Sequence, residues 1–382
     1  MSGASISRAL RSRRAVAAAA LLVVGVLAVV ACGLSDFEPQ SKVDNVRVFA
    51  VKASKPYAKP GEEVTLEALI TDGRPVKTRE LKNFWLPLVC INPPDDLYYL
   101  CFLPPSDGGA RAGARLIPVL PEGLAGQAGA DAGAGADAGA GAGGDAGTAQ
   151  NPFTIPPGFD LSPFLAQGPT FRFTMPTDAV TPRKGGPPYG LAVVFNIACA
   201  GRVVTLERSP EGGPQQLPIA CVDERGERVP PSDYVFAVSR VYAYDDRTNL
   251  NPKVLGAKVD GVPVPITGAA PVELERCTES SKDKCKEIKI DIDIAPESWE
   301  SDPNNVGPDG QIGREQIWVT YYSDIGDFDN DARLLFDTKS GRVDKSEVVF
   351  RAPTTPKNGT IWAVIHDNRA GAEWVVFPVR VK

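Results

Sequence analysis

Oxygen-bearing side chains gather in one short stretch of the C-terminal third of this chain. They are Asp324, Asp327, Asp329, Asn330 and Asp331. Calcium takes roughly six to eight oxygen ligands, and aspartates at alternate positions of a turn can direct several carboxylates to one point. The spacing makes Asp324, Asp327, Asp329 and Asp331 candidate ligands for a calcium ion.

The same stretch departs from the best-known calcium loop, the EF-hand. Ala332 stands where that loop needs glycine, and Thr338 stands where it has a bidentate glutamate. The alternative is a polar loop between strands, in which Asp and Asn serve turn geometry. We therefore predict no cofactor and keep calcium as the alternative.

His366 is the only histidine, and Asp367 and Asn368 follow it. A nucleophilic triad needs a base within reach of an activated Ser or Cys, and the chain has no Ser in a G-x-S-x-G turn. A polar residue at the end of a strand is the simpler interpretation, so we predict that the protein is not an enzyme.

Three tryptophans at strand spacing indicate either core positions or a sugar-binding platform. They are Trp318, Trp362 and Trp374.

The N-terminus is organised for export. Residues 1–14 carry four arginines and no acid, Ala15–Ala31 is an uninterrupted apolar run, and Val29-Val30-Ala31-Cys32 precedes Gly33. This ending resembles the lipobox of bacterial lipoprotein signal peptides. The resemblance implies a signal peptide at 1–31, a lipid on Cys32, and sorting to the outer membrane because Gly33 replaces an aspartate. The alternative is an uncleaved anchor, since the run is near the lower limit of the roughly 20 residues that span a bilayer.

Charge and composition limit the partners. Removal of residues 1–31 leaves 37 basic against 47 acidic residues, a net charge of −10. Nucleic acid binding calls for a basic surface, so none is predicted. The expected contacts are the membrane through the lipid and an unidentified protein partner.

Six cysteines remain beyond Cys32, an even number suited to disulfides outside the cytoplasm. They are Cys90, Cys101, Cys199, Cys221, Cys277 and Cys285. Each sequential pair brackets a turn-like segment, which favours pairing in that order. The main rival joins Cys90 to Cys199, because both end apolar strands.

Alternating apolar residues predict strands along the whole mature chain. Val64, Leu66, Ala68 and Ile70 share one face, and Ile288–Ile294 shows the cleanest alternation. An Ala/Gly-rich tract at 122–150 reads as a disordered insertion. We therefore predict an all-β fold with a tether at 32–42 and two immunoglobulin-like β-sandwich domains, at 43–248 and 249–382.

The later strands carry a family resemblance. Three segments, Ile317–Tyr322, Phe350-Arg351-Ala352-Pro353 and Gly359–Arg369, resemble the late strands of bacterial immunoglobulin-like and PKD-like surface domains. The whole layout is similar to lipoproteins of unknown function from GC-rich, myxobacteria-type Gram-negative bacteria. The resemblance implies a lipid-anchored cell-envelope protein that acts as a structural or protein-interaction module. The alternative is a calcium- or carbohydrate-dependent surface adhesin.

Overall fold

The computed structural model describes residues 39–102, 114–119, 156–206, 219–266, 270–281, 284–308 and 310–382. The predicted signal peptide, Cys32, most of the tether and the 122–150 insertion lie outside these ranges. Residues Ser41–Lys382 form one compact unit.

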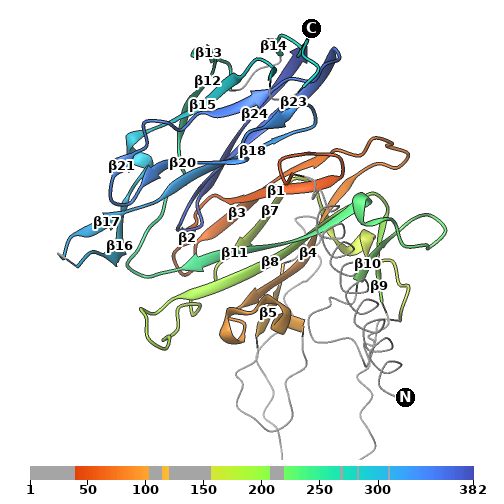
Figure 1. The fold of residues 1–382 in the computed structure, drawn as a ribbon. Coiled ribbons are helices and arrows are strands. Elements are labelled where there is room, and N and C mark those ends of the chain that lie inside the picture. The colour runs from red at the N-terminus through yellow and green to blue at the C-terminus, as the bar shows by residue number, and fades with distance from the viewer. Residues whose placement is uncertain are drawn as a thin grey trace, which may run out of the picture. The chain divides into compact units, whose positions relative to one another are not determined.

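Strands dominate the described ranges, and no α-helix occurs within them (Figure 1). Those before residue 245 are β1 (Val46–Ala53), β2 (Tyr57–Ala58), β3 (Glu63–Asp72), β4 (Lys82–Ile91), β5 (Arg115–Pro118), β6 (Ala166–Gln167), β7 (Thr170–Thr174), β8 (Gly190–Cys199), β9 (Arg202–Thr205), β10 (Ile219–Val222) and β11 (Tyr234–Ala243). Those after it are β12 (Val254–Val259), β13 (Val262–Val264), β14 (Val272–Leu274), β15 (Ile288–Ile294), β16 (Ser301–Val306), β17 (Ile312–Arg314), β18 (Ile317–Ser323), β19 (Asp327–Phe328), β20 (Ala332–Asp337), β21 (Gly341–Arg342), β22 (Val348–Arg351), β23 (Lys357–Asp367) and β24 (Ala372–Val381). The prediction of an all-β protein is confirmed.

Short 3-10 turns complete the described structure. They are η1 (Pro94–Asp96), η2 (Tyr98–Phe102), η3 (Ser162–Phe164), η4 (Pro231–Asp233) and η6 (Pro296–Ser298). In the part of the chain that is described, no helix has the length and apolar character needed to cross a membrane.

The first sandwich packs the sheet β1-β3-β7 against the sheet β2-β11-β8-β4-β5, with β6 added to β4. Its core contains Leu66 from one sheet, Trp85 from the other, and Phe171 stacked on Trp85. Successive side chains of a strand point to opposite faces, so alternate residues of each strand reach this core. Burial of these apolar side chains holds the two sheets together.

A second apolar cluster covers the opposite face of the larger sheet. It combines alternate residues of β4 and β8, such as Phe195, with residues of η2, β9 and β10. Every residue of β8 is buried as a result. Such burial on both faces is more usual for strands of parallel sheets. The first half of the chain is therefore layered more deeply than a plain two-sheet sandwich.

The second sandwich packs the sheet β13-β12-β15-β22-β19 against the sheet β14-β24-β23-β18-β20-β21. The isoleucines of β15 face its core, as the alternation predicted, and meet Tyr321, Phe350 and Phe377. These sheets are of the sandwich type found in immunoglobulin-like domains. The hairpin β16-β17 stands apart as a two-stranded sheet.

The three tryptophans do not lie in the second core. Trp362 packs on Phe49 of β1, with ring centroids 5.2 Å apart, and the amine of Lys52 lies 4.5 Å from the ring of Trp374. Trp318 stacks on His366. The core positions of the same strands are the alternate ones, such as Ile361 and Ile365. Trp362 is therefore buried, as a core position requires, but it lies under β1 and outside the second core, while Trp318 and Trp374 are half-buried on the same face of the sheet.

The start of the described chain is joined to the end of β18. The amide of Val43 donates to the carbonyl of Ser323 at 2.9 Å, and the amide of Ser323 donates to the carbonyl of Ser41 at 2.8 Å. Lys42 and Ser323 form a parallel bridge. The segment before β1 thus extends along a strand of the second sandwich.

Candidate functional site

A buried arginine occupies the turn between β23 and β24. Arg369 is only 7% exposed, and the carboxylate of Asp367 shapes its turn by accepting hydrogen bonds from the amides of Arg369, at 2.7 Å, and Gly371, at 2.8 Å. Asn249 donates to the carbonyl of Arg369 at 3.0 Å. A charge in such a place requires polar partners, because transfer out of water is costly.

The guanidinium of Arg369 binds three separate segments. It donates to the carbonyl of Ser301 at 3.0 Å and to the carbonyl of Thr248, and it lies 3.0 Å from the carboxyl group of Glu315. Its Nε atom has no hydrogen-bond partner among the described residues. The arginine therefore holds the connection after β11 against the second sandwich, and its Nε donor remains without a partner within the described ranges.

Glu315 is completely buried beside this arginine. Burial raises the pKa of Glu315 to about 8, and the nearby charge of Asp367 adds to this effect, while Arg369 opposes it. Desolvation outweighs the ion pair because the charged form of a carboxyl group loses its water in this place. At neutral pH the protonated form of Glu315 predominates.

A pocket of about 180 Å³ opens next to the buried arginine. Its lining consists of Tyr57, Asp246, Arg247, Thr248, Ser301, Pro303 and Arg369. The guanidinium of Arg369 lies 5.1 Å from the ring of Tyr57, and that of Arg247 lies 5.3 Å from the ring of Tyr244. The residues lining the pocket thus provide one aromatic ring, hydroxyl groups, guanidinium donors and a carboxylate.

A row of tyrosines runs from this pocket across the first sandwich. Tyr57 lies 4.7 Å from Tyr244 and 6.2 Å from Tyr242, and Tyr242 lies 5.8 Å from Tyr189, measured between ring centroids. The parallel pairing of β2 with β11 places Tyr57 opposite Tyr242. We call Tyr57, Tyr189, Tyr242 and Tyr244 the tyrosine row.

The far end of the row adjoins an unusual backbone segment. Asn92, Asp95 and Asp96 all have positive φ angles, of 50°, 52° and 57°. Non-glycine residues in this region store strain, commonly about 1–3 kcal/mol each, and persist where other contacts hold them. Here the carboxylate of Asp96 accepts a hydrogen bond from the hydroxyl of Tyr189, and Arg183 lies over that ring at 4.2 Å. Burial, reinforced by Asp96, raises the pKa of Tyr189 to about 12.

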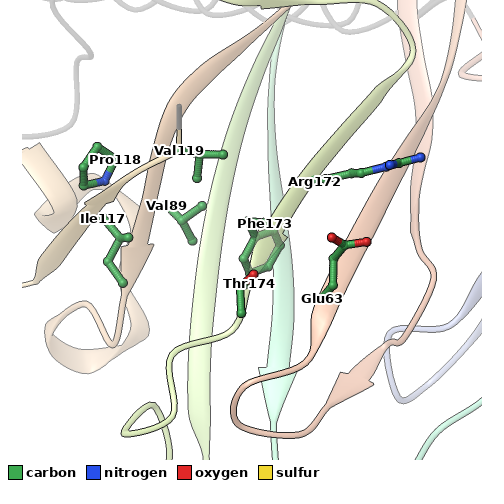
Figure 2. Close-up of a pocket in the computed structure, with 8 residues that line it drawn as sticks. All are labelled: Glu63, Val89, Ile117, Pro118, Val119, Arg172, Phe173 and Thr174. Atoms are coloured by element: carbon green, nitrogen blue, oxygen red, sulfur yellow. The ribbon is translucent and has the colours of Figure 1, made fainter. Parts of the chain in front are cut away.

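A second hollow, of about 320 Å³, lies between β7 and β5 (Figure 2). Val89, Ile117 and Phe173 form an apolar wall, and the charged side chains of Glu63 and Arg172 lie toward its other side. Few polar groups converge on it. A specific ligand site combines apolar walls with several placed polar groups, so the pocket at Arg369 is the better candidate.

The predicted calcium ligands serve other purposes in the structure. Asp324 accepts a hydrogen bond from the amide of Thr360 at 2.7 Å, and Asp327 belongs to β19. Asp329 accepts from the amide of Val349 at 2.9 Å and pairs with Arg333. Asp331 lies beyond β19, where its carbonyl accepts from the amide of Tyr321. Within the described ranges, no three His, Cys, Asp or Glu side chains are grouped to hold a metal.

The structure changes the expected effect of altering this loop. On charge repulsion alone, Asp329→Asn would be neutral or slightly stabilising. Because Asp329 instead binds Arg333 and the Val349 amide, we expect a loss of about 1 kcal/mol in the free energy of unfolding. Thermal unfolding with and without millimolar calcium measures both effects. A rise of several degrees with calcium, abolished in Asp329→Asn, would restore the calcium interpretation, and Asp344→Asn serves as a surface control.

The six cysteines form three disulfides in sequential order. They join Cys90 to Cys101, Cys199 to Cys221, and Cys277 to Cys285. The first two lie in the apolar cluster outside the larger sheet of the first sandwich. They tie η2 to β4, and the β9-β10 hairpin to the end of β8. The rival pairing of Cys90 with Cys199 does not occur.

Sequence reasoning missed the tyrosine row and Arg369. His366 was the residue singled out nearby, but burial lowers its pKa and it stacks on Trp318. The available signal was an Asp367-to-Gly371 turn between two apolar strands with a charge at its centre. The tyrosines gave no signal, because chain positions 57, 189 and 242 meet only through strand pairing.

No protein-family model and no curated protein matches the chain. Among solved structures, it is similar to fibronectin(III)-like modules of CbhA from Clostridium thermocellum, at 8% sequence identity and a TM-score of 0.20, over 87% of this chain and 94% of that one. It is also similar to dimeric latent PorU from Porphyromonas gingivalis, at 10% identity and a TM-score of 0.18, over 89% of this chain and 24% of that one. The β-sandwich assignment rests on the chain's own sheets and cores.

Proposed function

We propose that this protein is a lipid-anchored interaction module of the bacterial outer membrane, and that it acts by binding rather than by catalysis. The observation that carries the binding role is the tyrosine row that ends in a pocket with a buried arginine. Tyrosine and arginine are the side chains most enriched where binding energy concentrates, because they combine large contact area with directed hydrogen bonds. Two sandwiches supply a rigid support for such a surface.

Support for the anchor comes from the sequence. Four arginines, an apolar run and the Val-Val-Ala-Cys ending match a lipoprotein signal peptide. Each methylene of a buried acyl chain contributes about 0.8 kcal/mol, so two or more chains hold a protein firmly on a membrane. The three disulfides suit an oxidising compartment outside the cytoplasm.

Labelled palmitate should enter the wild-type protein in bacterial cells and should not enter Cys32→Ser. The thiol is the group that receives the diacylglycerol, and a hydroxyl at the same place is a poor substitute. Ser35→Ala is the matched control, since it changes a neighbouring residue and leaves the thiol intact. Equal labelling of wild type and Cys32→Ser would refute the anchor while leaving the binding surface untouched.

A further inference from the structure

The pocket beside Arg369 has the composition of a polyol site. The residues that line it carry hydroxyls (Tyr57, Thr248 and Ser301), guanidinium groups (Arg247 and Arg369) and a carboxylate (Asp246). Vicinal hydroxyls of a sugar both donate and accept hydrogen bonds. A wall that offers planar guanidinium donors and carboxylate acceptors together can satisfy both functions.

The buried arginine brings an unused donor to this pocket. Arg369 is more than nine-tenths buried, lines the pocket, and keeps its Nε without a hydrogen-bond partner among the described residues. A buried donor left without a partner costs about 1–3 kcal/mol. This atom is buried, so a ligand or water oxygen would recover that free energy only where a shift of the Arg369 side chain exposes it to the pocket.

The size of the pocket and the length of the tyrosine row fit an oligosaccharide, in which several sugar rings are linked. A volume of about 180 Å³ is below the roughly 300–1,000 Å³ of pockets that enclose drug-sized molecules. It admits one ring, and the next units of a chain would leave toward Tyr242 and Tyr189. Both are half-buried tyrosines, so part of each apolar ring is left for the C–H face of a sugar. At Tyr189 the hydroxyl is bonded to Asp96 and Arg183 covers one face of the ring, so this tyrosine offers ring surface only.

The local charge decides between neutral and acidic ligands. Asp302 is buried nearby, Glu300 lies 4.0 Å from the guanidinium of Arg369, and Asp246 adds a third carboxylate at the rim. Like charges close together are repelled, most strongly where water is excluded. The guanidinium groups of Arg247 and Arg369 oppose these charges, but three carboxylates against two guanidinium groups leave the surroundings of the pocket net negative. That balance disfavours a sugar that carries a carboxylate or phosphate.

We propose that the pocket and the tyrosine row bind a neutral oligosaccharide, with one terminal sugar in the pocket and the following units along Tyr242 and Tyr189. This inference rests on the proposed function and gives its binding surface a ligand class. The anchor at Cys32 is independent of it, so the palmitate experiment and the ligand experiment fail separately.

The test applies the full-length chain, in detergent, to a glycan array that carries neutral and uronate-bearing oligosaccharides. We expect binding to at least one neutral glycan, and at least tenfold weaker binding to its uronate-bearing counterparts. Arg247→Gln should weaken the neutral signal by at least tenfold, and Thr248→Val, which removes only a pocket hydroxyl, by severalfold. Far-ultraviolet circular dichroism and the melting temperature verify that both variants fold.

Arg380→Gln is the matched control. Arg380 is exposed on β24, pairs with Glu273, and lies outside both the pocket lining and the tyrosine row. Its substitution should leave glycan binding unchanged. The proposal is overturned by an array without a neutral ligand, by equal binding of acidic glycans, or by folded pocket variants that bind like the wild type.

Discussion

Replacing Cys199 and Cys221 together with alanine should lower the free energy of unfolding by about 3 kcal/mol, because their disulfide closes a separation of 22 residues in the unfolded chain. The bond also joins β10 to the end of a strand that is buried on both faces. Urea unfolding followed by circular dichroism gives the change in midpoint and slope. Hydrogen exchange should show that the amides of β9 and β10 lose protection before those of β11.

The matched comparison removes Cys277 and Cys285 in the same way. All four side chains are buried, so the loss of sulfur atoms costs a similar amount in both variants. The separation is only 8 residues, and the expected loss is about 2.5 kcal/mol. Protection of β9 and β10 should not change in this second variant. A loss below about 1 kcal/mol for the first pair would contradict its assigned role.

Raising the pH from about 5 to 8 should destabilise the wild-type protein through Glu315. The folded pKa of Glu315, about 8, lies above its ordinary value of 4.5, so the folded state holds the proton more tightly. The contribution of protonated Glu315 to the free energy of unfolding is complete below the ordinary pKa, and it is lost as the pH rises through the folded pKa. The maximal slope for one proton is about 1.4 kcal/mol per pH unit.

Glu315→Gln should flatten that pH dependence, because an amide resembles the protonated acid and does not ionise. Urea unfolding at several pH values gives the two curves. His366, whose pKa burial lowers, disfavours the folded state at acid pH, but it contributes equally to both proteins and cancels in their difference. Glu297→Gln, a change at an exposed ion pair, should keep the wild-type slope. Parallel curves for wild type and Glu315→Gln would show that Glu315 titrates normally.

The strands were predictable because each one encodes its own pattern. Ile288, Ile290, Ile292 and Ile294 point into the second core as their alternation indicated. Strict alternation does not describe β1, because its pairing with β3 shifts at a bulge between Val48 and Ala50. A bulge moves later side chains to the other face, and no local residue type announces it.

The candidate site could not be predicted from the sequence, because its residues lie far apart in the chain. Arg369, Glu315 and Thr248 belong to three connections, and only the docking of those connections brings them together. The tryptophans are a second example of long-range packing that the sequence did not predict. Their spacing identified the strands correctly, but which face is covered depends on β1, which lies more than three hundred residues before Trp362 in the sequence.

The docking of Ser41–Val43 on Ser323 determines how the protein would carry a mechanical load. A pull on the chain ahead of Ser41 first meets the two hydrogen bonds to Ser323, in a parallel arrangement that resists by shear along the strand. Tension would thus enter β18 of the second sandwich before it reached β1. The first sandwich, which carries most of the tyrosine row, would stay unstretched until those bonds gave way.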